Sequence, residues 1–338
     1  MAIIYYLESI MLNPELKLNP KIFEEPEERP IRDGFGDALL ELGEKNPNVV
    51  VLTADVAEST RVHKFAEKWP ERFIECGIAE QNMAGIAAGL GVSGKISFIS
   101  SYATFSPGKN WETIRTTIIY NDANVKIAGH HAGIATGPDG ATHQATEDIA
   151  IIRCLPNIRI ISPCDYFEAK KATLYSADVY GPFYLRFIRE KTPVITTEET
   201  PFRFGKIEYF WKPKTEKAEI AIMATGHLLY QALLAAKELQ EEGIDVYVLN
   251  VHTIKPLDEK TLLEVANKVK GIVTVEDHQI HGGMGSAIAE FLAKTKPLRI
   301  EFIGLQNTFG ESGNMKDLIK KYSLDKESIK SAVKKLLS

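Results

Sequence analysis

The first residue that could do chemistry is Glu80, which follows a turn at Gly77 and opens a stretch of small residues, Gln81–Leu90. At a helix N-terminus a carboxylate often only complements the helix dipole, which is worth about 0.3–1 kcal/mol. A buried carboxylate can instead act as a general acid or base. The Ala and Gly residues that follow Glu80 favour a helix that packs very closely against another backbone, as helices often do across an interface.

A pair of aromatic residues, Tyr102 and Phe105, follows a predicted strand at Ile96–Tyr102. Such a pair usually belongs to a hydrophobic core. In open α/β sheets, however, ligands bind beyond the carboxyl ends of the strands. The two rings could therefore form the wall of a pocket for a flat heterocycle.

A glycine-rich loop bounded by His131 and His143, with Asp139 inside it, follows the next predicted strand. Polar and titratable side chains concentrated in a loop often serve binding or catalysis. Zinc binding is the alternative, but no third His or Cys lies at ligand spacing from the two histidines. We therefore interpret the segment as a functional loop that holds no metal.

These clusters need a framework, and the hydrophobic pattern predicts one. Short β-branched runs alternate with longer amphipathic stretches, which indicates parallel β-α-β units. In the first half the predicted strands are Asn48–Asp55, Ile96–Tyr102, Asn124–His130 and Ile158–Ser162, and the predicted helices are Gln81–Leu90, Trp111–Tyr120 and Tyr166–Ala177. The expected fold class is α/β, with two open, mostly parallel, doubly wound sheets.

The second half repeats the alternation. Its predicted strands are Glu219–Ala224, Asp245–Val251, Gly271–Glu276 and Arg299–Gly304, and its predicted helices include Leu228–Glu242 and Asp258–Lys268. We expect an N-terminal arm (1–30), a first domain (31–190), a linker without clear periodicity (191–217) and a second domain (218–338). A turn with Gly282, Gly283 and Gly285 could cradle a phosphate at the helix that follows, but it lacks the G-x-G-x-x-G spacing.

Composition narrows the class of protein. The 338 residues are 44% hydrophobic and 25% charged, as in globular proteins. A net charge of -5 argues against nucleic acid as the main partner. The three cysteines form no C-x-x-C pair, which suits a reducing compartment, and no apolar stretch is long enough to cross a bilayer. We expect a cytoplasmic enzyme that does not bind a membrane.

Four stretches of this sequence, in the same order, resemble the C-terminal portion of transketolases. They are Glu75–Met83 (ECGIAEQNM), Asp139–Asp148 (DGATHQATED), Thr253–Asp258 (TIKPLD) and Glu276–Gly285 (EDHQIHGGMG). The likeness runs from about Arg32 to the end of the chain and covers the pyrimidine-binding and C-terminal domains of that family.

The resemblance implies thiamine diphosphate as cofactor. In the family, a glutamate at the position of Glu80 hydrogen-bonds a ring nitrogen of the cofactor's aminopyrimidine and promotes its imino form. That carboxyl group must hold or share a proton while it is buried. Tyr102 and Phe105 match the aromatic pair that packs on the pyrimidine ring, an arrangement worth about 0.5–1.5 kcal/mol beyond burial.

The resemblance also implies a sugar-phosphate site. His131, Asp139 and His143 match positions that line the substrate channel, where the histidines would orient sugar hydroxyls and shuttle protons. The group that would hold the phosphate end of the sugar is Arg32, Ser59 and Arg189. Arg186 lies close enough in sequence to be the alternative to Arg189. The implied reaction is transfer of a two-carbon ketol unit from a ketose phosphate to an aldose phosphate.

One expected motif is absent from the sequence. Thiamine enzymes of this class hold the diphosphate and Mg²⁺ (or Ca²⁺) through Gly-Asp-Gly, which occurs nowhere in this chain. The resemblance therefore implies a partner, a separate N-terminal transketolase subunit that carries the diphosphate-binding domain and the metal. Two copies of each chain would form a heterotetramer, with the cofactor shared between the two kinds of subunit.

Three other interpretations remain open. The same two domains occur in the beta subunit of 2-oxoacid dehydrogenases and in deoxyxylulose-phosphate synthases. The dehydrogenase subunit is expected to lack the phosphate-holding residues and the double-histidine loop. A non-catalytic regulatory homologue is a further alternative, against which the intact Glu80, aromatic pair and histidine loop argue.

Overall fold

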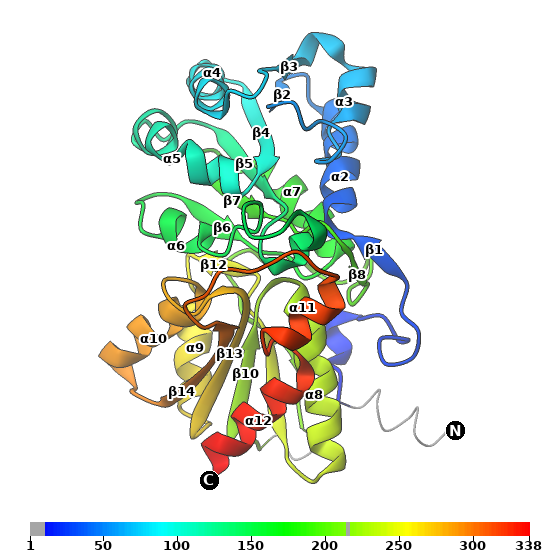
Figure 1. Cartoon of the computed structure of the whole chain (residues 1–338), viewed down its shortest axis with the longest axis vertical. Helices are drawn as coiled ribbons and strands as arrows, with labels where there is room; N and C mark the ends of the chain where they lie inside the picture. The colour runs from blue at the N-terminus through cyan, green and yellow to red at the C-terminus, as the bar shows by residue number, and fades with distance from the viewer. Residues whose placement is uncertain (1–10, 214–216) are drawn as a thin grey trace.

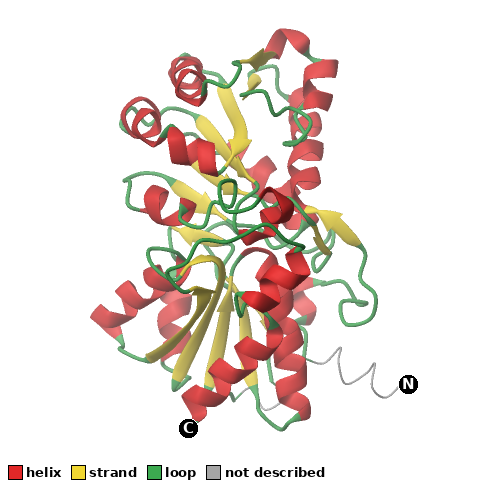
Figure 2. Cartoon of the chain, viewed as in Figure 1, coloured by secondary structure: helices red, strands yellow, loops and turns green. Residues whose placement is uncertain are grey.

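The computed structural model describes residues 11–213 and 217–338. They form two α/β units that lie end to end. The first half of the chain, blue to green in Figure 1, forms one layered unit, and the second half, yellow to red, forms the other. Each unit has a sheet with helices on both faces, as Figure 2 shows. The predicted fold class, α/β with two open and mostly parallel sheets, is confirmed.

Within the described part of the chain, the first sheet has seven strands, and all but one run parallel. In spatial order they are β12 (Thr253–Lys255), β6 (Arg159–Ile161), β7 (Phe183–Arg186), β5 (Val125–His130), β4 (Ile96–Tyr102), β2 (Val49–Thr53) and β3 (Phe73–Glu75). The central strands are buried along their whole length, which explains their β-branched composition. Strand β12 is the exception: it comes from the second half of the chain and pairs antiparallel with β6.

Helices cover both faces of this sheet. They are α2 (Ile31–Lys45), α3 (His63–Lys68), α4 (Glu80–Val92), α5 (Trp111–Thr113), α6 (Asp148–Arg153) and α7 (Tyr166–Asp178), with helical turns η3 (Thr104–Lys109) and η4 (Ile114–Ile119). Helices α2 and α7 pack very closely at Gly34. A Cβ on this residue would lie 2.2 Å from the carbonyl oxygen of Tyr166. Only glycine fits at that position.

The second sheet has five strands among the residues that the structure describes. Their order is β14 (Arg299–Leu305), β13 (Gly271–Gln279), β10 (Ile220–Ala224), β11 (Val246–Asn250) and β9 (Glu208–Trp211), and of these five β9 runs antiparallel. The helices of this half are α8 (Leu229–Glu241), α9 (Glu259–Ala266), α10 (Met284–Thr295), α11 (Met315–Lys321) and α12 (Lys326–Leu337).

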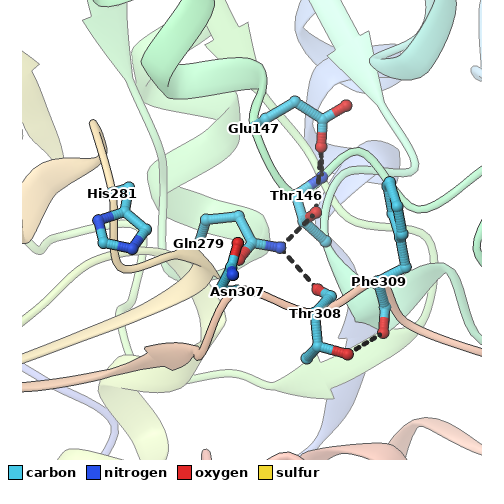
Figure 3. A pocket seen from close by; sticks show the side chains of 7 residues that line it. All are labelled: Thr146, Glu147, Gln279, His281, Asn307, Thr308 and Phe309. Carbon is cyan, nitrogen blue, oxygen red and sulfur yellow. Dashed lines mark hydrogen bonds between the residues drawn. The ribbon is translucent and has the colours of Figure 1, made fainter.

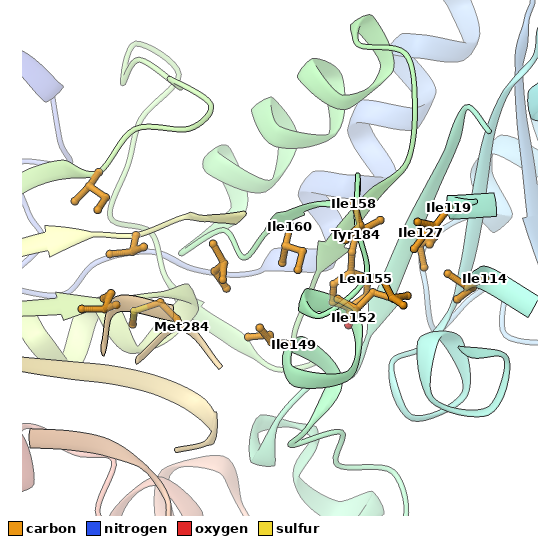
Figure 4. Packing of buried hydrophobic residues seen from close by; sticks show 14 of the residues in the cluster. Ile114, Ile119, Ile127, Ile149, Ile152, Leu155, Ile158, Ile160, Tyr184 and Met284 are labelled. Carbon is orange, nitrogen blue, oxygen red and sulfur yellow. The ribbon is translucent and has the colours of Figure 1, made fainter. Parts of the chain in front are cut away.

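One hydrophobic core continues from the first half into the second. Figure 4 shows Ile149 and Ile152 of α6 in the same cluster as Met284 of α10. Because side chains of both halves share this cluster, the two units pack directly against each other and are not joined by a flexible linker alone.

The expected arm and linker both contribute to packing. Residues 1–10 of the arm lie outside the described residues, but Met11, Leu16 and Ile22 are buried in the core of the second half. Strand β1 (Glu28–Pro30) pairs with β8 (Lys191–Pro193), which lies inside the expected linker, as does β9. The linker segment thus contains two short strands that periodicity did not reveal. No helix among the described residues is both long and apolar enough to span a membrane.

Candidate active site

Glu80 is the first residue of α4 and is only 2% exposed. Strand β3 ends at Glu75, and a turn with Gly77 at φ 65° directs the chain into the helix. The small residues predicted to favour close packing form this helix. A Cβ on Gly85 or Gly89 would meet nothing within 4 Å, so this face of α4 is open in the single chain.

Lys109 forms an ion pair with Glu80, with 2.6 Å between Nζ and Oε2. Its side chain is 45% exposed, so the ammonium group covers the carboxylate from the solvent side. The amide of Asn110 also donates to the backbone oxygen of Glu80, at 3.1 Å. Sequence reasoning missed both residues. A basic residue four positions after Phe105, at the end of the helical turn η3, is a signal that could have been used.

The predicted aromatic pair and the predicted histidines form one cluster. Tyr102 stacks on His131 with 3.8 Å between ring centroids, and Phe105 lies nearly parallel to Tyr102 at 6.0 Å. His143 meets both aromatic rings edge-on, at 6.0 and 5.5 Å. The register of β4 against β5 pairs Tyr102 with His130, so the two strands deliver their carboxyl ends to the same edge.

His131 is held neutral by its surroundings. Burial, and then the positive charges of Arg32 and Arg189, lower the pKa of His131 to about 2. Its Nε2 lies 3.4 Å from Nη1 of Arg32, which can only donate. Nε2 therefore accepts and Nδ1 carries the proton, a tautomer that follows from the hydrogen-bond partner.

The predicted phosphate-holding residues lie around this imidazole. Arg32 donates to the backbone oxygen of Ser59 at 2.8 Å, so it is the main chain rather than the hydroxyl of Ser59 that positions the arginine. Burial and the nearby charge of Arg61 lower the pKa of Arg32. Arg189 pairs with Asp139 at 2.9 Å. The structure thus brings all predicted substrate residues into one region of the first half.

Arg186, the alternative to Arg189, is committed to internal contacts. It is 3% exposed and forms two hydrogen bonds with Asp148, at 2.8 and 3.1 Å. The hydroxyl of Tyr184 donates to the same carboxylate at 2.6 Å. The side chain of Arg189, at 30% exposure, is the one of the two arginines that a ligand can reach.

The glycine turn at 282–285 is not free to cradle a phosphate. The carboxylate of Glu276 accepts hydrogen bonds from the backbone nitrogens of Met284 and Gly285, at 2.7 and 2.9 Å. This carboxylate therefore occupies the N-terminus of α10, where a phosphate would have to bind.

A separate hollow of about 490 Å³ lies where the two halves meet (Figure 3). Gln279 lines it and donates to Thr146 Oγ1 and to the backbone oxygen of Thr308, at 3.2 and 2.7 Å. The lining residues include none of the predicted site residues. Within residues 11–213 and 217–338, no cluster of three or more His, Cys, Asp or Glu side chains is arranged to hold a metal ion.

Buried polar atoms that a ligand could satisfy occur at the start of η3, directly after η3 and on His131. Thr104 Oγ1, Asn110 Oδ1 and His131 Nδ1 are buried and have no hydrogen-bond partner among the described residues. Buried polar atoms are normally paired. A heterocycle with its own donors and acceptors, lying against Phe105 and facing Glu80, would provide such partners.

Comparison with known proteins gives two family matches. The model of the transketolase pyrimidine-binding domain matches residues 27–194, and that of the transketolase C-terminal domain matches residues 211–329. A putative transketolase C-terminal section from Methanocaldococcus jannaschii is 45% identical over 88% of this chain and 93% of its own length.

Two further relatives bear on assembly and reaction. A solved structure described as a split gene transketolase, inactive beta4 tetramer, is 40% identical, with a TM-score of 0.84 over 91% of this chain and 98% of that one. A 1-deoxy-D-xylulose-5-phosphate synthase from Caldanaerobacter subterraneus is 37% identical over 89% of this chain, which spans 48% of that longer protein.

Proposed function

The chain belongs to the transketolase family, and from this we propose that it is the catalytic C-terminal subunit of a split, thiamine-diphosphate-dependent transketolase. The observation that carries the proposal is Glu80, a buried carboxylate at a helix start, in the half of the chain where aromatic rings and two histidines gather. Burial of a carboxylate can cost more free energy than its ion pair with Lys109 returns, which favours a functional reason for keeping it.

Thiamine diphosphate, when bound, supplies a thiazolium carbon that can make and break a carbon–carbon bond beside a carbonyl group. The residues of this chain fit its pyrimidine end. Glu80 would hold or share a proton with a ring nitrogen, and Phe105 would pack on the ring face. The unpaired atoms of Thr104 and Asn110 would be available to the polar edge of the ring.

The remaining residues would serve the sugar. The neutral imidazole of His131 has one nitrogen that accepts and one that donates, which suits a hydroxyl group. His143, edge-on to both aromatic rings, would hold or move a proton near the reacting carbons. Arg32 and Arg189 would bind the phosphate end, because a guanidinium fork matches phosphate oxygens. Asp139 would keep Arg189 in place through their ion pair.

A separate N-terminal subunit would supply the diphosphate and magnesium site. This chain contains no Gly-Asp-Gly motif, and a relative bears the name of a C-terminal section. The description of the β-only tetramer of a split transketolase as inactive also supports the need for a partner. We propose a heterotetramer in which the open face of α4, with Gly85 and Gly89, lies in an interface.

Reconstitution tests this function. The chain should be assayed alone and with a partner subunit that carries Gly-Asp-Gly, with thiamine diphosphate, Mg²⁺, a ketose phosphate and an aldose phosphate. We expect ketol transfer only from the mixture. Full activity of the chain alone would contradict the split.

Synthesis of deoxyxylulose phosphate is the second candidate, favoured by the similarity to a synthase of that compound. The same mixture should therefore be given pyruvate and an aldose phosphate. We expect no consumption of pyruvate, and consumption without ketol transfer would replace the first proposal by the second.

A further inference from the structure

Asp277, from the second half of the chain, reaches into the loop that carries the two histidines, defined here as the histidine loop (131–143). It lies near the end of β13 and is 2% exposed. Its Oδ1 accepts from the backbone nitrogen of Ile134 at 2.9 Å, and its Oδ2 accepts from that of Ala135 at 3.2 Å. Asp277 thus binds the main chain of the loop. Such hydrogen bonds fix the backbone conformation of the loop.

The carboxylate also requires a glycine in the loop. Gly133 has φ 72°, and a Cβ there would lie 2.2 Å from Oδ2 of Asp277. The loop therefore passes against the carboxylate at three successive residues, the first of which lies two positions after His131. A displacement of the loop at these residues would move His131 with it.

A second residue holds Asp277 itself. His227, buried in the turn η6 (Gly226–Leu228), lies 3.1 Å from Oδ2 through its Nε2. Burial acts to raise the pKa of the Asp277 carboxyl, but the hydrogen bond and charge of His227, the charge of Arg186 and the Ile134 nitrogen outweigh it and lower that pKa. The group that binds the loop is therefore an ionised carboxylate. Hydrogen bonds to a charged acceptor are stronger than those between neutral groups.

Further bonds cross between the halves at the same place. The guanidinium of Arg186 donates to the backbone oxygen of Asp277 at 2.8 Å. Gln144, just beyond the loop, donates to the backbone oxygen of Glu311 at 2.9 Å. The histidine loop is therefore braced from the second half at its start and beyond its end.

We propose that Asp277, supported by His227, is a positioning residue that sets the place of the histidine loop, and through it the fit of the sugar substrate. The anchoring of the loop stands on the geometry alone, whereas its effect on substrate rests on the proposed function. Asp277 touches no reacting atom in this account. The second half of the chain thereby takes part in substrate binding through the backbone of the first.

Glu276, the neighbouring residue on β13, provides a matched control. It is equally buried, at 1% exposure, and its carboxylate also accepts two backbone hydrogen bonds. Both of those bonds go to α10 inside the second half. Loss of its charge therefore weakens the second half without loosening the histidine loop.

The test compares Asp277→Asn with Glu276→Gln, and uses His227→Asn as a milder second variant in case Asp277→Asn does not fold. In the isolated chain, amide hydrogen exchange of residues 131–143 should be about tenfold faster in Asp277→Asn, because local opening becomes easier. In the reconstituted enzyme, the KM for the ketose phosphate should rise about tenfold while the affinity for thiamine diphosphate stays within about twofold. His227→Asn should move both quantities in the same direction by less.

Glu276→Gln should lower the unfolding temperature and leave loop exchange and KM at their wild-type values. The inference is overturned if Asp277→Asn leaves either loop exchange or KM unchanged, or if Glu276→Gln changes both as much. Absence of ketol transfer by the wild-type mixture would refute the proposed function instead, and the exchange measurement on the isolated chain would still decide whether Asp277 anchors the loop.

Discussion

At the scale of single residues, burial determines what each side chain of the site can do. His131 is neutral because burial and two nearby arginines oppose a second proton. The carboxylate of Glu80 is buried but faces an ammonium group at its edge. Arg189 and Arg186 differ in the same way, because the side chain of Arg189 is partly exposed and that of Arg186 is enclosed in its ion pair with Asp148.

Substitution of Arg189 should affect substrate binding, whereas substitution of Arg186 should affect stability. Arg189→Gln removes a charged donor from the site, so the KM for a phosphorylated ketose should rise roughly 10- to 100-fold in the reconstituted enzyme, with little change in stability. Arg186→Met leaves Asp148 buried without its partner, which should lower the free energy of unfolding by about 3–5 kcal/mol. Steady-state kinetics and urea unfolding of both variants measure this.

The double variant Arg186→Met/Asp148→Leu is the control for the buried pair. It removes both charges, so much of the lost stability should return. If Arg189→Gln binds phosphorylated and unphosphorylated sugars as the wild type does, Arg189 does not hold the phosphate.

At the scale of elements, the sequence predicted the strands and helices that deliver the site. Ile96–Tyr102 is a strand with the expected bounds, and the strand expected at Asn48–Asp55 is shorter by one residue at its start and two at its end. Such differences are usual at strand and helix ends. Parallel strands bring their carboxyl ends to one edge, so the meeting of the aromatic pair with the histidine loop could also be expected.

Contacts between distant segments could not be predicted in this way. Strand β12 pairs with the first sheet across almost a hundred residues of chain, and Asp277 binds Ile134 across 143 positions. Neither contact produces a periodic pattern of hydrophobic residues in the sequence, which is the signal that predicts helices and strands. Lys109 was missed for a related reason, since a single lysine in a loop usually points into solvent and only the fold shows that it meets Glu80.

At the scale of the whole molecule, three of the buried histidines among the described residues link stability to pH. Burial lowers the pKa of His130 well below its ordinary value, that of His131 to about 2 and that of His252 to about 3. In the unfolded chain each would titrate near pH 6.5. Below that pH the unfolded state binds protons that the folded state does not, so the stability present above about pH 6.5 is lost as the pH falls.

The expected loss is measurable by denaturant unfolding. Between about pH 7.5 and pH 5.5, each of the three histidines should lower the free energy of unfolding by about 1.4 kcal/mol, or about 4 kcal/mol together. His130 lies between Phe35 and Phe187 and neither ring nitrogen has a partner among the described residues. His130→Phe should therefore reduce the loss by about 1.4 kcal/mol. An equal loss in the variant and the wild type would contradict the account.

The most direct test of the account is the turnover number of Glu80→Gln in the reconstituted enzyme. Gln keeps the size of the side chain but cannot exchange a proton, whereas Glu112→Gln makes the same change at an exposed position on α5 and serves as the control. We predict that kcat falls about 100-fold or more in Glu80→Gln and stays unchanged in Glu112→Gln. An undiminished kcat in Glu80→Gln would contradict the claim that this carboxylate works on the cofactor.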